Sequence, residues 1–171
     1  VLAGRRVPKA HALDPVLVGE CLGGALYTED FRRILRGLGR LDHRVVSKRR
    51  LSIDNADIET KVGMIDFYSM TMRVFKLDDL EDICEDYRQR ATYLGTMPNQ
   101  SHAFRLDDHH IFISGKPMLV CGNTASMLGN TRFAKHFKIT GDRTTHYGPF
   151  NCAPASVKVD DEDPTTGGAC C

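Results

Sequence analysis

The sequence predicts an α+β fold, in which the end of an α/β unit is followed by a separate α+β domain. Two observations carry this prediction. Helical patterns and a strand pattern come first along the chain, and a series of short apolar runs typical of strands comes next. A further helix pattern follows these runs, and after Ile139 the sequence becomes polar, with proline and glycine at intervals.

The first helix signal is Asp14-Pro15, which joins a capping side chain to a proline at the first helical position. Apolar residues keep helical spacing beyond this start, and the spacing places Cys21 on the face directed at the core. A second helix is expected from Thr28 to Gly37, because acidic residues favour its first turn and glycine favours its end.

Strand patterns fill the middle of the chain. A β-branched run predicts a strand over residues 44–53, and alternation predicts another over residues 67–77. The acidic stretch 78–86 is expected to be a loop. Four shorter strands are expected after it, at residues 90–94, 103–106, 111–114 and 118–121, the last of them at a sheet edge after Pro117. Short helices are expected after the capping residues Asn55 and Asn123, ending near residues 62 and 133.

Composition excludes several classes of partner. Apolar residues make up 42% and charged residues 26% of the chain, and the formal net charge is +1. The charge gives no electrostatic case for binding nucleic acid or an acidic membrane surface. No apolar run is long enough to cross a bilayer, and the first residues lack the apolar core of a signal peptide. We therefore expect a cytoplasmic protein with reduced thiols, and the downstream part of something longer.

Common cofactor and metal motifs are missing from the sequence. There is no Gly-x-Gly-x-x-Gly after a strand and no phosphate-binding loop. The run from Asp107 to His110 contains metal-binding residue types, but consecutive side chains cannot all face one ion, so an exposed polar turn is expected. No Cys-x-x-Cys occurs, which weakens a zinc or redox domain as a third class of function.

The six cysteines are the remaining chemical feature. Cys21 lies between Gly19 and the pair Gly23-Gly24, where a thiol is either a small packing residue or accessible to a soft ligand. Cys121 follows an apolar strand and is expected to serve packing. Soft thiolates select soft or thiophilic centres, and such a centre needs two or three sulfurs.

A family resemblance rests on residues 14–27. They read Asp-Pro-Val-Leu-Val-Gly-Glu-Cys-Leu-Gly-Gly-Ala-Leu-Tyr and closely resemble a signature of arsenite methyltransferases. The similarity continues through Phe75-Lys76-Leu77, through the segment 107–115 and through the segment 131–137. It covers about residues 5–151, and the cysteine-rich end also resembles the variable tail of such enzymes.

The resemblance implies an upstream Rossmann-like domain that binds S-adenosylmethionine. Residues 1–54 would then be the C-terminal tail of that methyltransferase domain. Residues 55–150 would be the arsenic-binding domain, a small mixed α/β domain with a mainly antiparallel sheet, and residues 151–171 a flexible tail that contains cysteines. The isolated chain is expected to be inactive, because the donor-binding motif is missing from it.

The same resemblance implies which residues bind the substrate. Cys21 matches a cysteine that binds As(III). The family's second such cysteine is expected within residues 63–67, which read Gly-Met-Ile-Asp-Phe here. Either Cys84 takes that role or this lineage has lost one ligand. Further thiols that are candidate accessory ligands are Cys152, Cys170 and Cys171. No catalytic side chain and no metal site are expected.

The function that the resemblance implies is binding of trivalent arsenic by cysteine thiolates for methyl transfer from S-adenosylmethionine, which detoxifies arsenic. Trivalent arsenic, its thiol conjugates and a thiol reductant such as glutathione or thioredoxin would be the partners, without nucleic acid or membrane. The alternative is a stand-alone thiol module that sequesters As(III) or another soft ion without catalysis.

Overall fold

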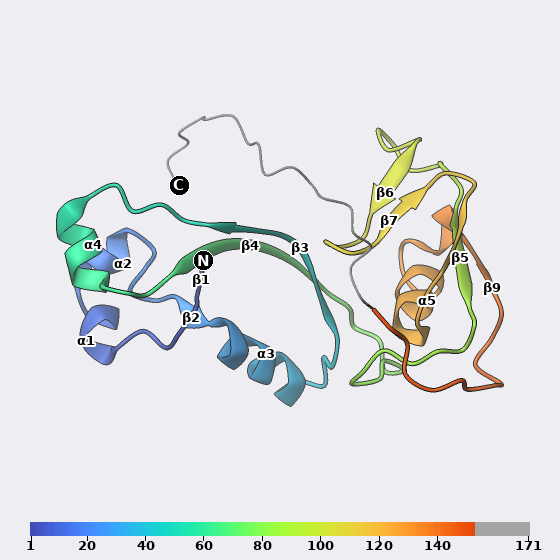
Figure 1. The fold of residues 1–171 in the computed structure, drawn as a ribbon, viewed down its shortest axis with the longest axis horizontal. Helices are drawn as coiled ribbons and strands as arrows, with labels where there is room; N and C mark the ends of the chain where they lie inside the picture. The colour runs from blue at the N-terminus through green and yellow to red at the C-terminus, as the bar shows by residue number, and fades with distance from the viewer. Residues whose placement is uncertain (153–171) are drawn as a thin grey trace.

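The computed structural model describes residues 1–152 and shows a mixed α/β structure with mainly antiparallel strand pairing. Figure 1 shows two units joined by a pair of long strands. Each unit has its own cluster of buried apolar side chains, and Phe67 belongs to the first cluster and Phe75 to the second. The domain boundary expected between residues 54 and 55 stays a prediction.

The first unit holds four helices and a four-stranded sheet. Its elements are β1 (Leu2–Ala3), α1 (Lys9–Ala12), α2 (Pro15–Gly19), β2 (Leu26–Tyr27), α3 (Thr28–Gly37), β3 (His43–Arg50), α4 (Ala56–Val62) and β4 (Phe67–Val74). The strand order is β2-β1-β4-β3, in which β1 pairs parallel with β2 and antiparallel with β4.

Side-chain caps start two of these helices where the sequence predicts them. The carboxylate of Asp14 accepts from the Val16 N–H at 2.9 Å, and the amide oxygen of Asn55 accepts from the Asp57 N–H at 2.9 Å. Each cap satisfies donors that lack a partner inside the helix. Lys61 on α4 also donates to Asp14 at 2.7 Å, which links α4 to the start of α2.

Strands β3 and β4 form a long antiparallel ribbon. Their register shifts between Val45 and Ser47, so that Val46 has no partner on β4. Such an extra residue bends the strand and increases its local twist. The end of the ribbon near Arg44 reaches the second unit, where the N–H of Asp108 donates to the carbonyl of Val45 at 2.8 Å.

The second unit combines short strands with one helix. Its elements are β5 (Arg90–Tyr93), β6 (Ala103–Arg105), β7 (Ile111–Ile113), β8 (Pro117–Leu119), α5 (Gly122–Gly129), a 3-10 turn (Ala134–His136) and β9 (Phe137–Thr140). Strands β8, β5 and β9 form one antiparallel sheet, and β6 and β7 form a separate hairpin.

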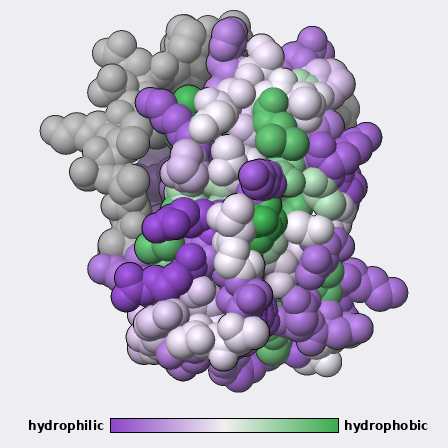
Figure 2. Space-filling model, turned by 90° about the vertical axis from the view of Figure 1, so that its right-hand side faces the viewer, coloured by the Kyte–Doolittle hydropathy of each residue, from purple (hydrophilic) through white to green (hydrophobic). Residues whose placement is uncertain are grey.

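Aromatic rings fill the core of this unit. Tyr93 on β5 is fully buried, and its ring centroid lies 5.1 Å from that of Phe137 on β9. Phe104 from the hairpin packs on Phe133 at 5.1 Å. Figure 2 shows the side of this unit that faces away from the first unit, where hydrophilic side chains dominate and apolar ones are scattered.

Most expected elements are present, with differences at their ends. The four short strands, the loop 78–86 and the helices after Thr28 and Asn55 are confirmed. The helix expected near Asn123 is present, but Cys121 is its cap, since its sulfur accepts from the Thr124 N–H at 3.5 Å. The sequence patterns do not predict α1, β1, β2 or β9. In the described part of the chain, no helix has the length and apolarity needed to span a membrane.

The buried hydroxyl of Tyr93 gives a stability test of the second unit. It donates to the carbonyl of Gln100 at 2.7 Å and accepts from the N–H of Met97 at 3.2 Å. Tyr93→Phe leaves both groups without this partner, so we expect the free energy of unfolding to fall by about 1–2 kcal/mol. Urea unfolding followed by circular dichroism measures it. Tyr147→Phe, at a 55% exposed position, should change little; equal losses would contradict the assignment.

Candidate functional site

Cys21 lies in a tight turn that ends α2, and the helix expected to continue through it is absent. The N–H groups of Leu22 and Gly23 both fold back to the carbonyl of Leu17, each at 2.8 Å. These bonds end the helix at Gly19, because they replace the helical pattern. Cys21 is therefore exposed instead of facing the core.

The backbone of this turn is strained at Cys21. Its φ is +59°, in the left-handed region that residues with a Cβ rarely adopt. Gly23 is tightly enclosed, since a Cβ there would lie 2.7 Å from the carbonyl oxygen of His11. Strained backbone that the surroundings hold in place is found preferentially at functional sites. The turn thus presents an exposed thiol from a fixed backbone.

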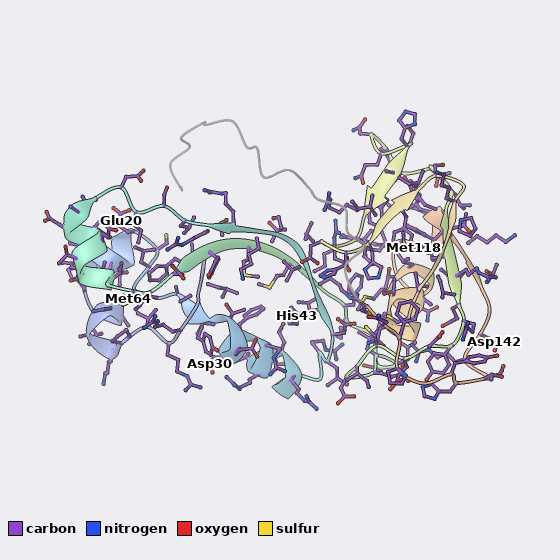
Figure 3. The ribbon with its side chains drawn as sticks, viewed as in Figure 1. Glu20, Asp30, His43, Met64, Met118 and Asp142 are labelled. Carbon is purple, nitrogen blue, oxygen red and sulfur yellow. The ribbon has the colours of Figure 1, made fainter. Side chains whose placement is uncertain are left out.

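The structure does not bring Cys84 to Cys21. The segment 63–67, where the second ligand is expected, holds no cysteine, and its Ile65 is buried in the same apolar cluster as Leu17 and Leu22. Figure 3 labels Glu20 and Met64, the sequence neighbours of Cys21 and Ile65, at the same end of the molecule. This segment thus contributes an apolar side chain, and no thiol, to the cluster that contains Leu22.

Cys84 instead belongs to a group of three thiols in the second unit. The sulfurs of Cys84, Cys121 and Cys152 all lie within 4.8 Å of one another. Cys121 is fully buried, whereas Cys84 and Cys152 are partly exposed, and all three thiols are free. Cys170 and Cys171, the other expected accessory thiols, lie outside the described residues.

Backbone hydrogen bonds hold the three cysteine segments side by side. The Gly122 N–H donates to the carbonyl of Glu85 at 3.0 Å, which fixes the start of α5 next to the segment of Cys84. On the other side, the Phe150 N–H donates to the carbonyl of Cys84 at 2.8 Å. The Cys84 segment therefore lies between the other two.

A cavity of about 340 Å³ opens beside this group, between the second unit and the end of the ribbon. Cys84 and Cys152 are among its lining residues. Other lining residues come from α3, from β3 and the residue before it, from the 107–110 turn and from the start of α5, and include Arg36, Asp42, Arg44, Asp107, His110 and Asn123. A small solute can thus approach the two partly exposed thiols from solvent.

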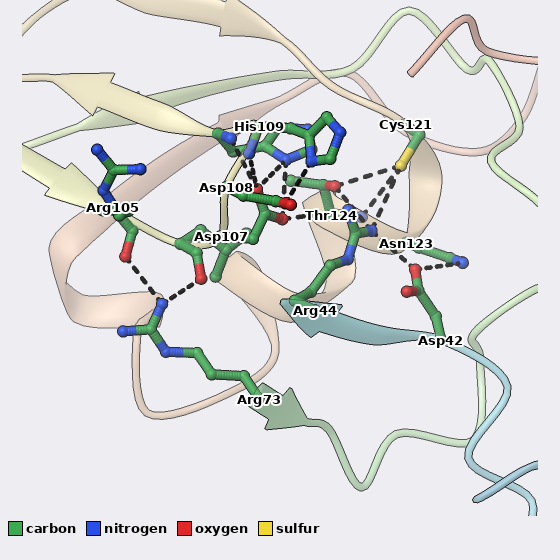
Figure 4. Close-up of polar contacts among 12 residues, drawn as sticks. Asp42, Arg44, Arg73, Arg105, Asp107, Asp108, His109, Cys121, Asn123 and Thr124 are labelled. Carbon is green, nitrogen blue, oxygen red and sulfur yellow. Dashed lines mark hydrogen bonds and ion pairs between the residues drawn. The ribbon is translucent and has the colours of Figure 1, made fainter. Parts of the chain in front are cut away.

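Arg44 on β3 connects the ribbon to the thiol group (Figure 4). Its guanidinium donates to Asp42 at 2.7 Å, to Asp107 at 3.3 Å and to the Thr124 hydroxyl at 3.2 Å. It also lies 3.9 Å from the sulfur of Cys121. Because Arg44 and Asp107 are buried, these contacts compensate charges that water does not reach.

Hydrogen bonding among the thiols shifts their pKa values in opposite directions. The Cys84 thiol donates to Cys121 and lowers the pKa of Cys121, with support from Thr124 and the charge of Arg44 against the effect of burial. The same bond, followed by burial, raises the pKa of Cys84. Burial also raises the pKa of Cys152. Negative charge in this group is thus favoured on the sulfur of Cys121 over those of Cys84 and Cys152.

The 107–110 turn differs from the exposed polar turn expected there. Asp108 and His109 are exposed, but Asp107 and His110 are buried and joined at 2.8 Å. Burial alone would raise the pKa of Asp107, but its bonds to His110 and the charge of Arg44 hold that pKa below its usual value. Asp107 is therefore a buried carboxylate that pairs with His110 and Arg44. Neither Cys121 nor Arg44 could be recognised from the sequence as a candidate residue of this site.

The backbone of Cys21 can be tested without any ligand. Glycine adopts a φ of +59° freely, so Cys21→Gly should raise the free energy of unfolding by about 0.5–1 kcal/mol, after allowance for the extra entropy of glycine in the unfolded chain. Cys21→Ala keeps the Cβ and should not stabilise the chain. Chemical denaturation of both variants checks this, and equal stabilities would show that the turn is not strained.

The lowered pKa of Cys121 predicts a thiolate that survives mild acid. In the reduced chain, far-ultraviolet absorbance of about one thiolate should persist at a pH about two units below the ordinary thiol pKa of about 8.5. Cys121→Ser should remove this signal and Cys21→Ser should leave it. Loss of all thiolate absorbance together near the ordinary pKa would contradict the assignment.

Similarity to known proteins covers the whole chain. A family model described as "Arsenite methyltransferase C-terminal domain" matches residues 86–169, a start later than the one expected for the second domain. The arsenite methyltransferase of Aquipseudomonas alcaligenes is 44% identical over 171 residues, 100% of this chain and 49% of that protein. The mouse arsenite methyltransferase is 32% identical over 96% of this chain and 43% of its own length.

A solved structure is also similar. The crystal structure of an arsenic(III) S-adenosylmethionine methyltransferase from Chlamydomonas reinhardtii matches with a TM-score of 0.83 and 50% identity, over 88% of this chain and 50% of that one. This chain thus spans about half the length of the relatives it matches. Residues 86–169 match the C-terminal domain of the arsenite methyltransferases, and the whole chain is similar in sequence to members of that family.

Proposed function

We propose that this chain supplies the C-terminal part of an S-adenosylmethionine-dependent arsenite methyltransferase and binds trivalent arsenic through the Cys21 thiolate. The observation that carries the proposal is the exposed Cys21 thiol on a strained turn, inside the segment that resembles the family signature. A thiolate suits this substrate, because soft sulfur ligands select soft, thiophilic centres.

The turn is suited to positioning the arsenic. Its backbone is fixed by the bonds to the Leu17 carbonyl, so the sulfur varies only by rotation of one side chain. Positioning of this kind is a large part of catalysis when two reactants must meet in one geometry. A single thiolate binds arsenic weakly. We propose that the other sulfur ligands of the arsenic at Cys21 come from outside the described residues.

The residues of this chain do not fit S-adenosylmethionine. The sequence holds no Gly-x-Gly-x-x-Gly, and among the described elements the short β1 and β2 are not followed by such a loop. We therefore assign no residue of this chain to the methyl donor and propose that an upstream Rossmann-like domain binds it.

Exposed apolar side chains support an upstream partner domain. Large apolar residues of the first unit that are at least 45% exposed include Val16, Val18, Leu26, Ile34 and Leu38. They lie on α2, β2 and α3 or directly after α3, close in sequence to Cys21. Covering exposed apolar side chains with a partner removes them from water, which favours association. We propose that the donor-binding domain covers these side chains. We also propose that the protein is cytoplasmic and that a thiol reductant keeps its cysteines reduced.

A chimeric enzyme tests the proposal. The part of the A. alcaligenes relative that this chain does not match is joined to this chain, and methylated arsenic products are quantified after incubation with arsenite, a thiol reductant and S-adenosylmethionine. We expect turnover by the chimera and none by the isolated chain. Cys21→Ser should lower the rate by at least about 100-fold, because a hydroxyl cannot replace a soft thiolate ligand.

Two controls make this test specific. Cys21→Gly relaxes the turn and stabilises the chain, so its loss of activity would come from the missing sulfur and not from unfolding. Asn99, another residue with positive φ, lies in a loop of the second unit, and Asn99→Gly should leave the rate unchanged. A Cys21→Ser chimera as active as its parent would refute the role of Cys21.

A further inference from the structure

We infer that Cys84, Cys121 and Cys152 form a second binding site for trivalent inorganic arsenic, separate from Cys21, in which the arsenic atom bonds to all three sulfurs. This site goes beyond the proposed function, which needs only Cys21 and the upstream domain. It requires no methyl donor and acts by retention of arsenic in the second unit.

The geometry of the thiol group suits a single atom. Sulfur bonds to a metal-sized atom of about 2.3 Å bring the sulfurs around it to within about 4 Å of each other. The three sulfurs already lie within 4.8 Å, so small side-chain rotations suffice. The sulfurs come from three separate segments that backbone hydrogen bonds hold side by side.

The number of ligands favours trivalent arsenic over zinc. Structural zinc sites are closed by four protein ligands, whereas trivalent arsenic is satisfied by three. Within the described residues, this group contains three cysteines and no histidine or carboxylate that completes a tetrahedron. Asp42, the neighbouring carboxylate, is already bound by Arg44 and by the Asn123 amide at 3.1 Å.

Access and order of reaction follow from exposure. Cys84 and Cys152 line the cavity, which is large enough to admit arsenous acid, whereas Cys121 lies beneath them and is fully buried. Arsenous acid therefore meets the outer thiols first. Arg44 and Thr124 hold the sulfur of Cys121 at the base of the site, at 3.9 and 3.2 Å.

The binding step needs no oxidant or reductant. Three arsenic–sulfur bonds form while three arsenic–hydroxyl bonds break, and arsenic stays trivalent. The three hydroxyls leave as water, and each takes the proton of the thiol that replaces it, or a proton from solvent where that sulfur is already ionised. The bound arsenic joins the Cys152 segment to the start of α5, so it should also stabilise the second unit.

The test is titration of the reduced full chain with sodium arsenite, read by native mass spectrometry and by arsenic X-ray absorption. We expect one tightly bound arsenic with three sulfur neighbours. Cys84→Ser and Cys152→Ser, at partly exposed positions, should weaken binding by at least about 100-fold, since even residues that only support ligands are worth 10–100-fold in metal affinity. Cys21→Ser, the matched control, should keep the tight arsenic.

Several results would overturn the inference. They are an arsenic that is lost in Cys21→Ser but kept in Cys84→Ser, an X-ray absorption spectrum with fewer than three sulfurs in the parent chain, or a tightly held zinc that arsenite does not displace. Failure of the chimeric enzyme to turn over, with tight arsenic binding retained by Cys21→Ser, would refute the proposed function and leave this site intact.

Discussion

The buried ion pairs of Arg44 are the interaction on which the arrangement of the two units depends. A guanidinium taken out of water is costly unless its partners are in place, and breaking a buried pair usually costs more than the pair contributes. Here the partners come from both units: Asp42 lies just before β3, whereas Asp107 and Thr124 belong to the second unit. The docked ribbon ends at this buried cation, which also lines the cavity, and its charge adds to the hydrogen bonds from Cys84 and Thr124 that lower the pKa of Cys121.

Much of the fold could be predicted because it is encoded locally. Asp14 and Asn55 are capping residues that act within three positions, and Pro117 marks an edge strand through its missing N–H. The end of α2 could not be predicted in this way, since Leu22, Ala25 and Leu26 continue the apolar spacing of a helix, whereas the N–H groups of Leu22 and Gly23 bond to the carbonyl of Leu17. Strand β9 lies beside β5 through pairing with a distant segment, which no local pattern reports.

The convergence of the three thiols could not be predicted, for a related reason. Cys84 and Cys152 were recognised as candidate ligands, but nothing in their spacing shows that Cys121 meets them, because the three converge only after the second unit has folded. Cys121 has the signature of a packing residue and is indeed buried, yet it also caps α5 and faces the other thiols. Arg44 stands in a basic, strand-like run, where a solvated position is the ordinary expectation.

The register shift in β3 determines which side chains of this strand face the second unit. Alternate residues of a strand face opposite sides, and Arg44 directly precedes Val45, where the shift begins. An insertion or deletion of one residue between the shift and Arg44 would turn the guanidinium to the other face of the strand. The side chain of a valine would then face the second unit. The exposed end of β3, where Lys48, Arg49 and Arg50 lie, can thus change without affecting this contact. Near Arg44 the length of the strand cannot change, because the buried ion pairs of Arg44 would be lost.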